Sequence, residues 1–431
     1  MADQPRAVVH VGAPKTGTTY LQAVLWRNRD TLRDAGVRYP LQGPGEHFAA
    51  ALDVREMAWG GRRDGPWVGA WDRVSRRVEA WDGSVVLSNE LLGGVTPDQA
   101  RRIADSMTNG SDRELHVVFT ARDLARQLPS DWQEHVKHRH DVTLSTFVDD
   151  LVQLGLDAPA PFGTLFWGLH DAERVLRTWA SVAPVEHLHL VTVPRVSKGA
   201  RTGGAPDLWE RFAEAAGLDR LALDLDVEPR NVSLGVVEAE LLRRINGALE
   251  GRFPHRFYDD LVRAVLAEQV LVAPGRANPA SERPTLPPKQ QVWVEERSRQ
   301  LVEAVRAAGY HVVGDLDDLV PGKEPDGRQP EDLSSNELLP VALDAITGLL
   351  GQAASIADHG ADARELRRRV RELTAELAQT RAERNYWKEG GLRHRLVRFS
   401  DQHSWLLPVR RAFVAMRNRL RRGQRRGRAD G

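Results

Sequence analysis

The segment at residues 7–26 constrains the fold of this chain more than any other. An apolar run at residues 7–11 predicts a buried β-strand, and apolar residues at helical spacing in 21–25 predict an amphipathic helix. Between them lies GAPKTGTT, residues 12–19, a loop of small residues and hydroxyls. A loop between a strand and a helix N-terminus holds phosphate through backbone N–H groups, and Lys15 adds a full positive charge. The segment therefore predicts a phosphate-binding loop to which the rest of the chain presents a second reactant.

Strand and helix patterns alternate through the first 320 residues. Short apolar runs at residues 84–88, 115–120 and 188–193 predict further strands, and residues 311–313 predict an edge strand. The helical patterns lie at 97–107, 143–155, 164–182, 206–217, 233–250 and 290–309. This alternation predicts an α/β fold with a doubly wound parallel sheet.

Three chemically distinctive residues each follow a predicted strand. They are Lys15, Glu90 and Arg122. Because ligands of open α/β sheets bind at the carboxyl ends of strands, we expect these three side chains to share one site.

The second half of the chain predicts a separate extension. A polar segment at 321–337 predicts a linker after an α/β domain over residues 1–320. Residues 338–390 predict a helical region, in which a heptad-like series at 366–387 fits a short coiled coil or a helical hairpin equally well. A coiled coil would make the protein a homo-oligomer.

The net charge of the chain is zero, but net positive charge is concentrated in a basic tail at residues 391–431. This tail holds 12 arginines and 2 aspartates among apolar residues. A basic amphipathic segment favours an anionic membrane surface, although a solvated charged tail explains the pattern as well. Nucleic acid is a third option, which we do not expect as a partner.

Other features of the sequence bound the location and chemistry. Cysteine is absent, which excludes disulfides, thiolate nucleophiles and cysteine-based metal sites. No signal-peptide pattern opens the chain, and Pro340 and Asp344 make the apolar segment near them a poor membrane span. We expect a cytoplasmic protein that associates peripherally with the inner face of the membrane through its tail.

The position of Lys15 narrows the kind of phosphate loop. A Walker A loop places its lysine directly after the second glycine, whereas Lys15 precedes Gly17. No acidic motif for a nucleotide-bound Mg²⁺ is evident either. A nucleotide kinase or other P-loop NTPase is therefore the less favoured alternative, beside a non-catalytic scaffold.

Two motifs together resemble a known family. The loop sequence G-x-P-K-T-G-T-T after the first strand resembles the 5′-phosphosulfate loop of PAPS-dependent sulfotransferases (PAPS is 3′-phosphoadenosine 5′-phosphosulfate). A later strand ends in Arg122, and Ser130 follows eight residues on, as in the family's 3′-phosphate motif. The resemblance covers roughly residues 7–220 and points to bacterial, carbohydrate-sulfotransferase-like members.

The resemblance implies PAPS as the cofactor, with no metal. Lys15 would stabilise the bridging oxygen, and the 5′-phosphate would be held by Pro14, Lys15, Thr16, Gly17, Thr18 and Thr19. Arg122 and Ser130 would grip the 3′-phosphate. Two alternatives stay open: Arg122 pairs with Asp123 or Asp131, and Ser130 is the N-cap of a capping box.

The acceptor is expected to be a hydroxyl of a carbohydrate, glycolipid or secondary metabolite, and it needs a base. Glu90 is the first choice, since the resembling carbohydrate-type enzymes place a glutamate there, and His47 is the second. His135 and His138 are expected to face solvent or the 3′-phosphate. The late RKGxxGDW segment of cytosolic members is absent, and residues 198–204 or 230–233 are candidates to close the site.

Overall fold

The computed structural model describes residues 4–58, 63, 65–108, 112–195, 207–227, 233–272, 282–322 and 328–355, together with isolated residues between 368 and 416. Residues 1–349 form one compact unit, which extends past the polar segment at 321–337. The heptad-like series at 366–387 and the tail at 391–431 lie outside the described residues, apart from those isolated positions.

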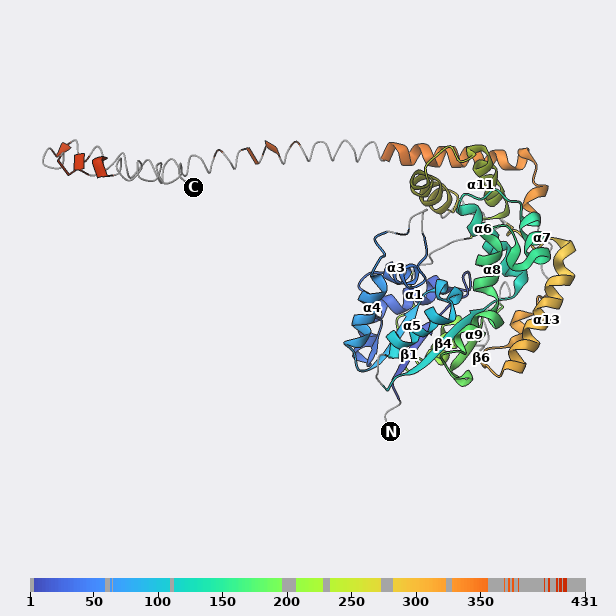
Figure 1. Ribbon diagram of the computed structural model, residues 1–431. Coiled ribbons are helices and arrows are strands. Elements are labelled where there is room, and N and C mark those ends of the chain that lie inside the picture. Colours follow the sequence, from blue (N-terminus) through green and yellow to red (C-terminus); the bar gives the residue numbers. More distant parts are fainter. Residues whose placement is uncertain are drawn as a thin grey trace. The chain divides into compact units, whose positions relative to one another are not determined.

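A six-stranded sheet organises this unit, in the order β2-β3-β1-β4-β5-β6 (Figure 1). Every pairing is parallel, so the predicted α/β fold with a parallel sheet is confirmed. The strands are β1 (Arg6–His10), β2 (Val37–Arg38), β3 (Ser84–Ser88), β4 (Glu114–Ala121), β5 (Leu188–Thr192) and β6 (His311–Val313). Ala7, Val8, Val9 and His10 of β1 are all buried, as expected for a central strand covered on both faces.

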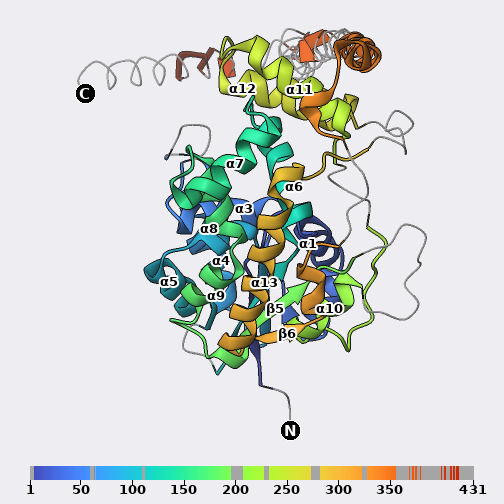
Figure 2. The same ribbon diagram turned by 90° about the vertical axis from the view of Figure 1, so that its right-hand side faces the viewer.

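Helices cover both faces of the sheet. Figure 2 shows α1 and α10 on one side of the sheet and α5 and α9 on the other. The helices around the sheet are α1 (Thr18–Arg27), α2 (Arg29–Asp34), α3 (Glu46–Val54), α4 (Ala70–Glu79), α5 (Pro97–Thr108), α9 (Ala172–Trp179), α10 (Leu208–Ala216) and α13 (Gln291–Ala308). Their apolar faces and the strands form one continuous core, which fixes where each strand ends.

A second core of helices lies beyond the carboxyl end of β4 (Figure 1). Its elements are α6 (Leu124–Lys137), α7 (Leu144–Leu154), α8 (Phe162–His170), α11 (Val236–Leu249), α12 (His255–Phe257) and a π-helix, η4 (Tyr258–Val270). Trp132 and Phe147 are completely buried in it. The 3₁₀ segments are η1 (Glu90–Gly94), η2 (Gly155–Asp157), η3 (Val185–His187), η5 (Pro288–Gln290), η6 (Leu316–Leu319) and η7 (Pro330–Asp332).

One local prediction differs from the structure, and two elements were not predicted. The pattern at residues 164–182 predicted one helix, but α8 and α9 are separate because Asp171 caps α9 by accepting a hydrogen bond from the Arg174 N–H. The two-residue strand β2 was not predicted, and neither was the π-helix η4.

One helix among the described residues, Ser335–Ser355, is long and apolar enough to cross a membrane, and 11% of its most apolar window is buried. Length and composition alone are weak evidence for a membrane span.

Candidate phosphate-binding site

The sheet order brings three strand ends side by side. β1 pairs with β3 on one side and with β4 on the other, with His10 opposite Ser88 and opposite Val118. The chain leaves β1 toward β2 and β3, and then returns across β1 to form β4. Ligands of open α/β sheets bind at such a switch point, outside the carboxyl ends of the strands. The loop after β1, Glu90 after β3 and Arg122 after β4 all lie at this edge.

The backbone of the loop needs glycine at two places. Gly12 has φ 106° and Gly17 has φ 94°, and Lys15 itself is left-handed with φ 61°. A Cβ on Gly12 would lie 3.2 Å from the carbonyl oxygen of Glu90, and one on Gly17 would lie 2.4 Å from Leu208 Cδ2. The loop is thus enclosed by η1 on one side and by the start of α10 on the other.

Buried threonine hydroxyls hold the loop in place through hydrogen bonds. The Thr16 hydroxyl donates to the Ala13 carbonyl at 2.6 Å and lies 2.5 Å from Thr120 Oγ1. The Thr120 hydroxyl donates to the Gly12 carbonyl at 2.9 Å and lies 3.2 Å from His10 Nε2. Burial lowers the pKa of His10 to about 3, so this ring is neutral near neutral pH. The network therefore holds the loop in place through neutral groups, because His10 carries no charge.

Lys15 is paired with a carboxylate on α6. Lys15 Nζ lies 2.5 Å from Glu134 Oε2, and His138 Nε2 lies 3.4 Å from Glu134 Oε1. Burial favours a higher pKa for the Glu134 carboxyl, but the His138 hydrogen bond and the charges of Lys15 and Lys137 hold its pKa well below the usual value. Glu134 was not predicted from the sequence. The signal is the spacing of four on one helix, which places Ser130, Glu134 and His138 on the same face.

The structure brings Arg122 and Ser130 into direct contact. Arg122 Nη2 donates to Ser130 Oγ at 2.9 Å, and Arg122 Nη1 donates to the Lys15 carbonyl at 2.9 Å. Ser130 lies inside α6 and donates to the Arg126 carbonyl at 2.9 Å. Arg122 thus contacts both the loop after β1 and the helix after β4.

The alternative role of Ser130 as an N-cap is wrong, because Asp123 caps α6 by accepting from the Arg126 N–H. Asp123 also pairs with the Arg126 side chain.

The buried carboxylate of Asp131 has histidine partners. It lies 3.3 Å from His135 Nε2 and 3.2 Å from His170 Nε2. His135 is buried, so it does not face solvent, which was one of the two environments expected for it. His170 Nδ1 in turn lies 3.0 Å from Gln127 Nε2, which donates to the Pro14 carbonyl at 2.9 Å. This series of polar contacts links the second helical core to the loop.

The two predicted bases lie at the side of the loop that η1 encloses. Glu90 begins η1 and accepts a hydrogen bond from Gln22 Nε2 at 3.2 Å. His47 Nδ1 lies 2.8 Å from Asn89 Nδ2. Burial lowers the pKa of His47, and the charge of Glu90 raises it by a smaller amount. Glu90 and His47 are close enough to influence each other electrostatically.

Tyr39 extends this group and was not predicted. Its hydroxyl is buried and has no hydrogen-bond partner among the described residues. Burial, and then the charge of Glu90, raise the pKa of Tyr39 above its usual value. The Tyr39 hydroxyl is buried, lacks a partner among the described residues and lies near the predicted base Glu90. It is therefore suited to hydrogen-bond with an incoming acceptor hydroxyl.

A cavity of about 610 Å³ lies elsewhere, between α7, α9 and α13. Its walls carry Trp167, Trp293, Arg174, Arg177 and Arg297. No residue predicted for the phosphate site lines it, so it is a separate feature.

The segment at 198–204 lies outside the described residues, as do positions 230–232 of the other predicted closing segment. Comparisons of the chain with family models, with curated proteins and with solved structures found no match.

Proposed function

We propose that the protein is a PAPS-dependent sulfotransferase that moves the sulfuryl group to a hydroxyl of a carbohydrate, glycolipid or secondary metabolite. The observation that carries the proposal is the position of Arg122, which hydrogen-bonds both Ser130 and the Lys15 carbonyl. One guanidinium thereby joins the two motifs that would hold the two phosphate groups of this nucleotide.

The charged and hydroxyl groups at the strand edge suit the phosphate groups of the donor. Lys15 and the loop N–H groups would hold the 5′-phosphosulfate, with Thr18 and Thr19 at the start of α1. Arg122 and Ser130 would hold the 3′-phosphate by charge-assisted hydrogen bonds. The glycines at 12 and 17 leave no Cβ where the loop meets Glu90 and Leu208.

Sulfuryl transfer requires a group that stabilises the leaving phosphate and a base that takes the proton of the acceptor. The bond between sulfur and the bridging oxygen breaks while a bond between sulfur and the acceptor oxygen forms, and negative charge develops on the leaving phosphate. The Lys15 ammonium would stabilise that charge. Glu90 would take the proton of the acceptor hydroxyl, with His47 as the second candidate.

A transfer assay tests the proposal. Radiolabelled sulfate from PAPS should appear on an acceptor, and Lys15→Ala should abolish the transfer. Lys289→Ala is the matched control, because Lys289 is 57% exposed and pairs with Asp149 away from the loop. If adenosine 3′,5′-bisphosphate fails to bind at micromolar concentrations, the proposal is wrong.

The same assays separate the alternatives. A kinase or NTPase would hydrolyse ATP in the presence of Mg²⁺, and Lys15→Ala would reduce that activity instead. A non-catalytic scaffold would bind the bisphosphate without transferring sulfate to any acceptor.

The basic tail adds a proposal about the acceptor. We infer that the enzyme acts on a lipid-linked hydroxyl at an anionic membrane face, since residues 391–431 hold 12 arginines and 2 aspartates. Flotation with anionic liposomes tests this, because deleting the tail should abolish binding to the liposomes while leaving nucleotide affinity unchanged.

A further inference from the structure

Four histidines gather at the amino ends of neighbouring strands, away from the phosphate site. His116 lies near the start of β4, His189 on β5 and His311 on β6, and His187 ends η3 just before β5. His189 pairs in register with His311 and with Val118 of β4. Because alternate residues of a strand share a face, His116 and His189 lie on the same face of the sheet.

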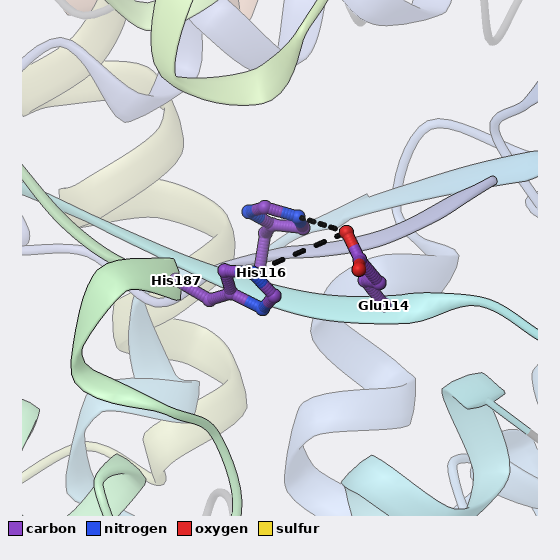
Figure 3. Close-up of side chains that lie close together, drawn as sticks. All are labelled: Glu114, His116 and His187. Atoms are coloured by element: carbon purple, nitrogen blue, oxygen red, sulfur yellow. Dashed lines mark ion pairs between the residues drawn. The ribbon is translucent and has the colours of Figure 1, made fainter. Parts of the chain in front are cut away.

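A carboxylate completes the group (Figure 3). Glu114 Oε2 lies 3.7 Å from His116 Nε2 and 4.0 Å from His187 Nε2. One ligand atom from each of the three residues lies within 4.8 Å of the others. The rings of His116 and His187 stack with their centroids 4.1 Å apart. Three potential donors thus face one small volume.

One of these donors is buried without a partner. His116 is 5% exposed, and its Nε2 atom makes no hydrogen bond to any of the residues that the structure describes. The distance of 3.7 Å to Glu114 is too long for a hydrogen bond. A buried polar atom without a partner is costly, so this nitrogen is suited to an additional ligand.

The other nitrogen of His116 is already oriented. His116 Nδ1 lies 2.9 Å from His189 Nε2, and His189 Nδ1 lies 2.8 Å from His311 Nδ1. Two proton assignments satisfy both contacts. A metal ligand requires the one in which His116 donates from Nδ1 to His189 and His189 donates from Nδ1 to His311. That assignment leaves His116 Nε2 with a free lone pair. Histidine ligands of metals are oriented by such a hydrogen bond from the second ring nitrogen.

We propose that Glu114, His116 and His187 bind a divalent transition-metal ion of the Zn²⁺ type, with water in a fourth position. Two imidazoles and one carboxylate are a donor set that suits Zn²⁺, whereas Mg²⁺ and Ca²⁺ prefer oxygen. Bonds of about 2.0–2.2 Å place tetrahedral ligand atoms roughly 3.4 Å apart. The observed distances therefore require a movement of a few tenths of an ångström or more, and the Glu114 side chain, which is 38% exposed, can supply it.

The charges near the proposed metal site affect its affinity for a cation, and its position in the sheet indicates its role. The positive charge of Arg6 acts on both His116 and His189, which weakens cation binding. The Glu114 carboxylate, close to His116 and His187, supplies a negative charge that favours it. The ion would join β4 to η3, and so to the start of β5. It lies at the amino ends of the strands, whereas the phosphate site lies at their carboxyl ends. We therefore propose a structural metal site. It is independent of sulfate transfer, a reaction for which we expect no metal.

Titration of the chelator-treated full chain with ZnCl₂ tests the proposal. Calorimetry should show one strong site, and the temperature of unfolding should rise with the Zn²⁺ concentration because the ion binds the folded state. Co²⁺ in place of Zn²⁺ should give the visible absorption of a tetrahedral site in the wild-type protein. Absence of both the strong site and this spectrum in the wild type would overturn the proposal without any variant.

Variants locate the site. His187→Ala and Glu114→Gln, at partly exposed positions, should each weaken the strong site at least tenfold, and His189→Gln should weaken it by about 10- to 100-fold through the orientation of His116. His255→Ala, at an exposed position, is the matched control and should bind like the wild type. Equal Zn²⁺ affinity in the wild type and His187→Ala would show that the metal binds elsewhere.

Discussion

Lys15 and Glu134 form an ion pair of 2.5 Å although 119 residues separate them in the sequence. The pair connects the loop after β1 with the helix after β4, and both side chains are only partly exposed, at 27% and 30%. An anion that enters the loop competes with Glu134 for the same ammonium. Glu134 is therefore expected to set both the resting position of Lys15 and the affinity for phosphate.

Replacing Glu134 by glutamine should strengthen the binding of adenosine 3′,5′-bisphosphate. A pair of this exposure contributes about 1 kcal/mol, which corresponds to roughly fivefold in affinity. Calorimetry with the bisphosphate measures the change, and Glu173→Gln, which removes a surface pair with Arg177, is the control. Weaker binding in Glu134→Gln would show that the carboxylate positions Lys15 rather than competing for it.

Removing the Ser130 hydroxyl should lower the affinity for the 3′-phosphate selectively. A hydrogen bond to a charged group contributes about 1.5–3 kcal/mol, so Ser130→Ala should bind adenosine 3′,5′-bisphosphate roughly 10- to 100-fold more weakly. Binding of AMP, which has no 3′-phosphate, should not change. Ser181→Ala removes an exposed hydroxyl that also donates to a backbone carbonyl, and it should affect neither ligand.

Glu90→Gln should abolish turnover and spare nucleotide binding. Loss of a general base lowers the rate by about 10²–10⁴-fold, while the contact with Gln22 and the loop backbone does not require the charge. Steady-state transfer rates and bisphosphate affinity are measured together, with the exposed Glu79→Gln as the control. If His47→Asn loses the activity and Glu90→Gln retains it, the base is His47.

Gly17→Ala should weaken both folding and nucleotide binding. A left-handed backbone costs an L-residue about 1–2 kcal/mol, and the new Cβ would lie 2.4 Å from Leu208 Cδ2. Gly36 also has a positive φ of 81° but no atom within 4 Å of its added Cβ. Gly36→Ala should therefore lose only the cost of the left-handed backbone from its free energy of unfolding in urea, and should keep the affinity for the bisphosphate. Equal affinity in both variants would contradict a role for the Gly17 contact in the site.

The buried His10 should make the protein less stable as the pH falls. Its pKa is about 3 in the folded state, whereas the unfolded chain titrates near its ordinary value of about 6.5. Between these values the unfolded state binds more protons, so stability falls with decreasing pH by about 1.4 kcal/mol per pH unit for this residue. Urea unfolding at about pH 7 and about pH 5 should show a smaller loss for His10→Asn than for the wild type. The same loss in both proteins would contradict the assignment.

The sequence predicted the parts of the fold that depend on local pattern. Apolar runs with turn residues between them located four central strands and the edge strand β6, and helical spacing located α5 and α10. The spacing from Arg122 to Ser130 indicated two residues that act on one ligand group, and the structure brings their side chains into direct contact. These features are local, or they follow from the rule that parallel strands end at one edge.

The remaining features depend on contacts between distant segments. The Lys15–Glu134 pair could not be predicted, because it requires knowing which face of α6 packs over the loop. The histidine group at the amino ends of the strands depends on the register of β4, β5 and β6, which no single strand encodes. The break at Asp171 is an exception, because a local N-cap hydrogen bond from the Arg174 N–H makes it, and the continuous helical pattern at 164–182 obscured that signal.

The contact between Gly17 and Leu208 has a consequence for biosynthesis. A nascent chain that has reached residue 130 already contains Lys15, Arg122 and Ser130, but it lacks α10 and the strands β5 and β6. Leu208, which lies against Gly17, is added much later. If the loop binds a nucleotide in the conformation described here, that binding requires a chain in which the ribosome has completed β5 and the helix α10 that follows it. A chain that terminates before Leu208 carries the charged groups of the site without the side chain that encloses the loop.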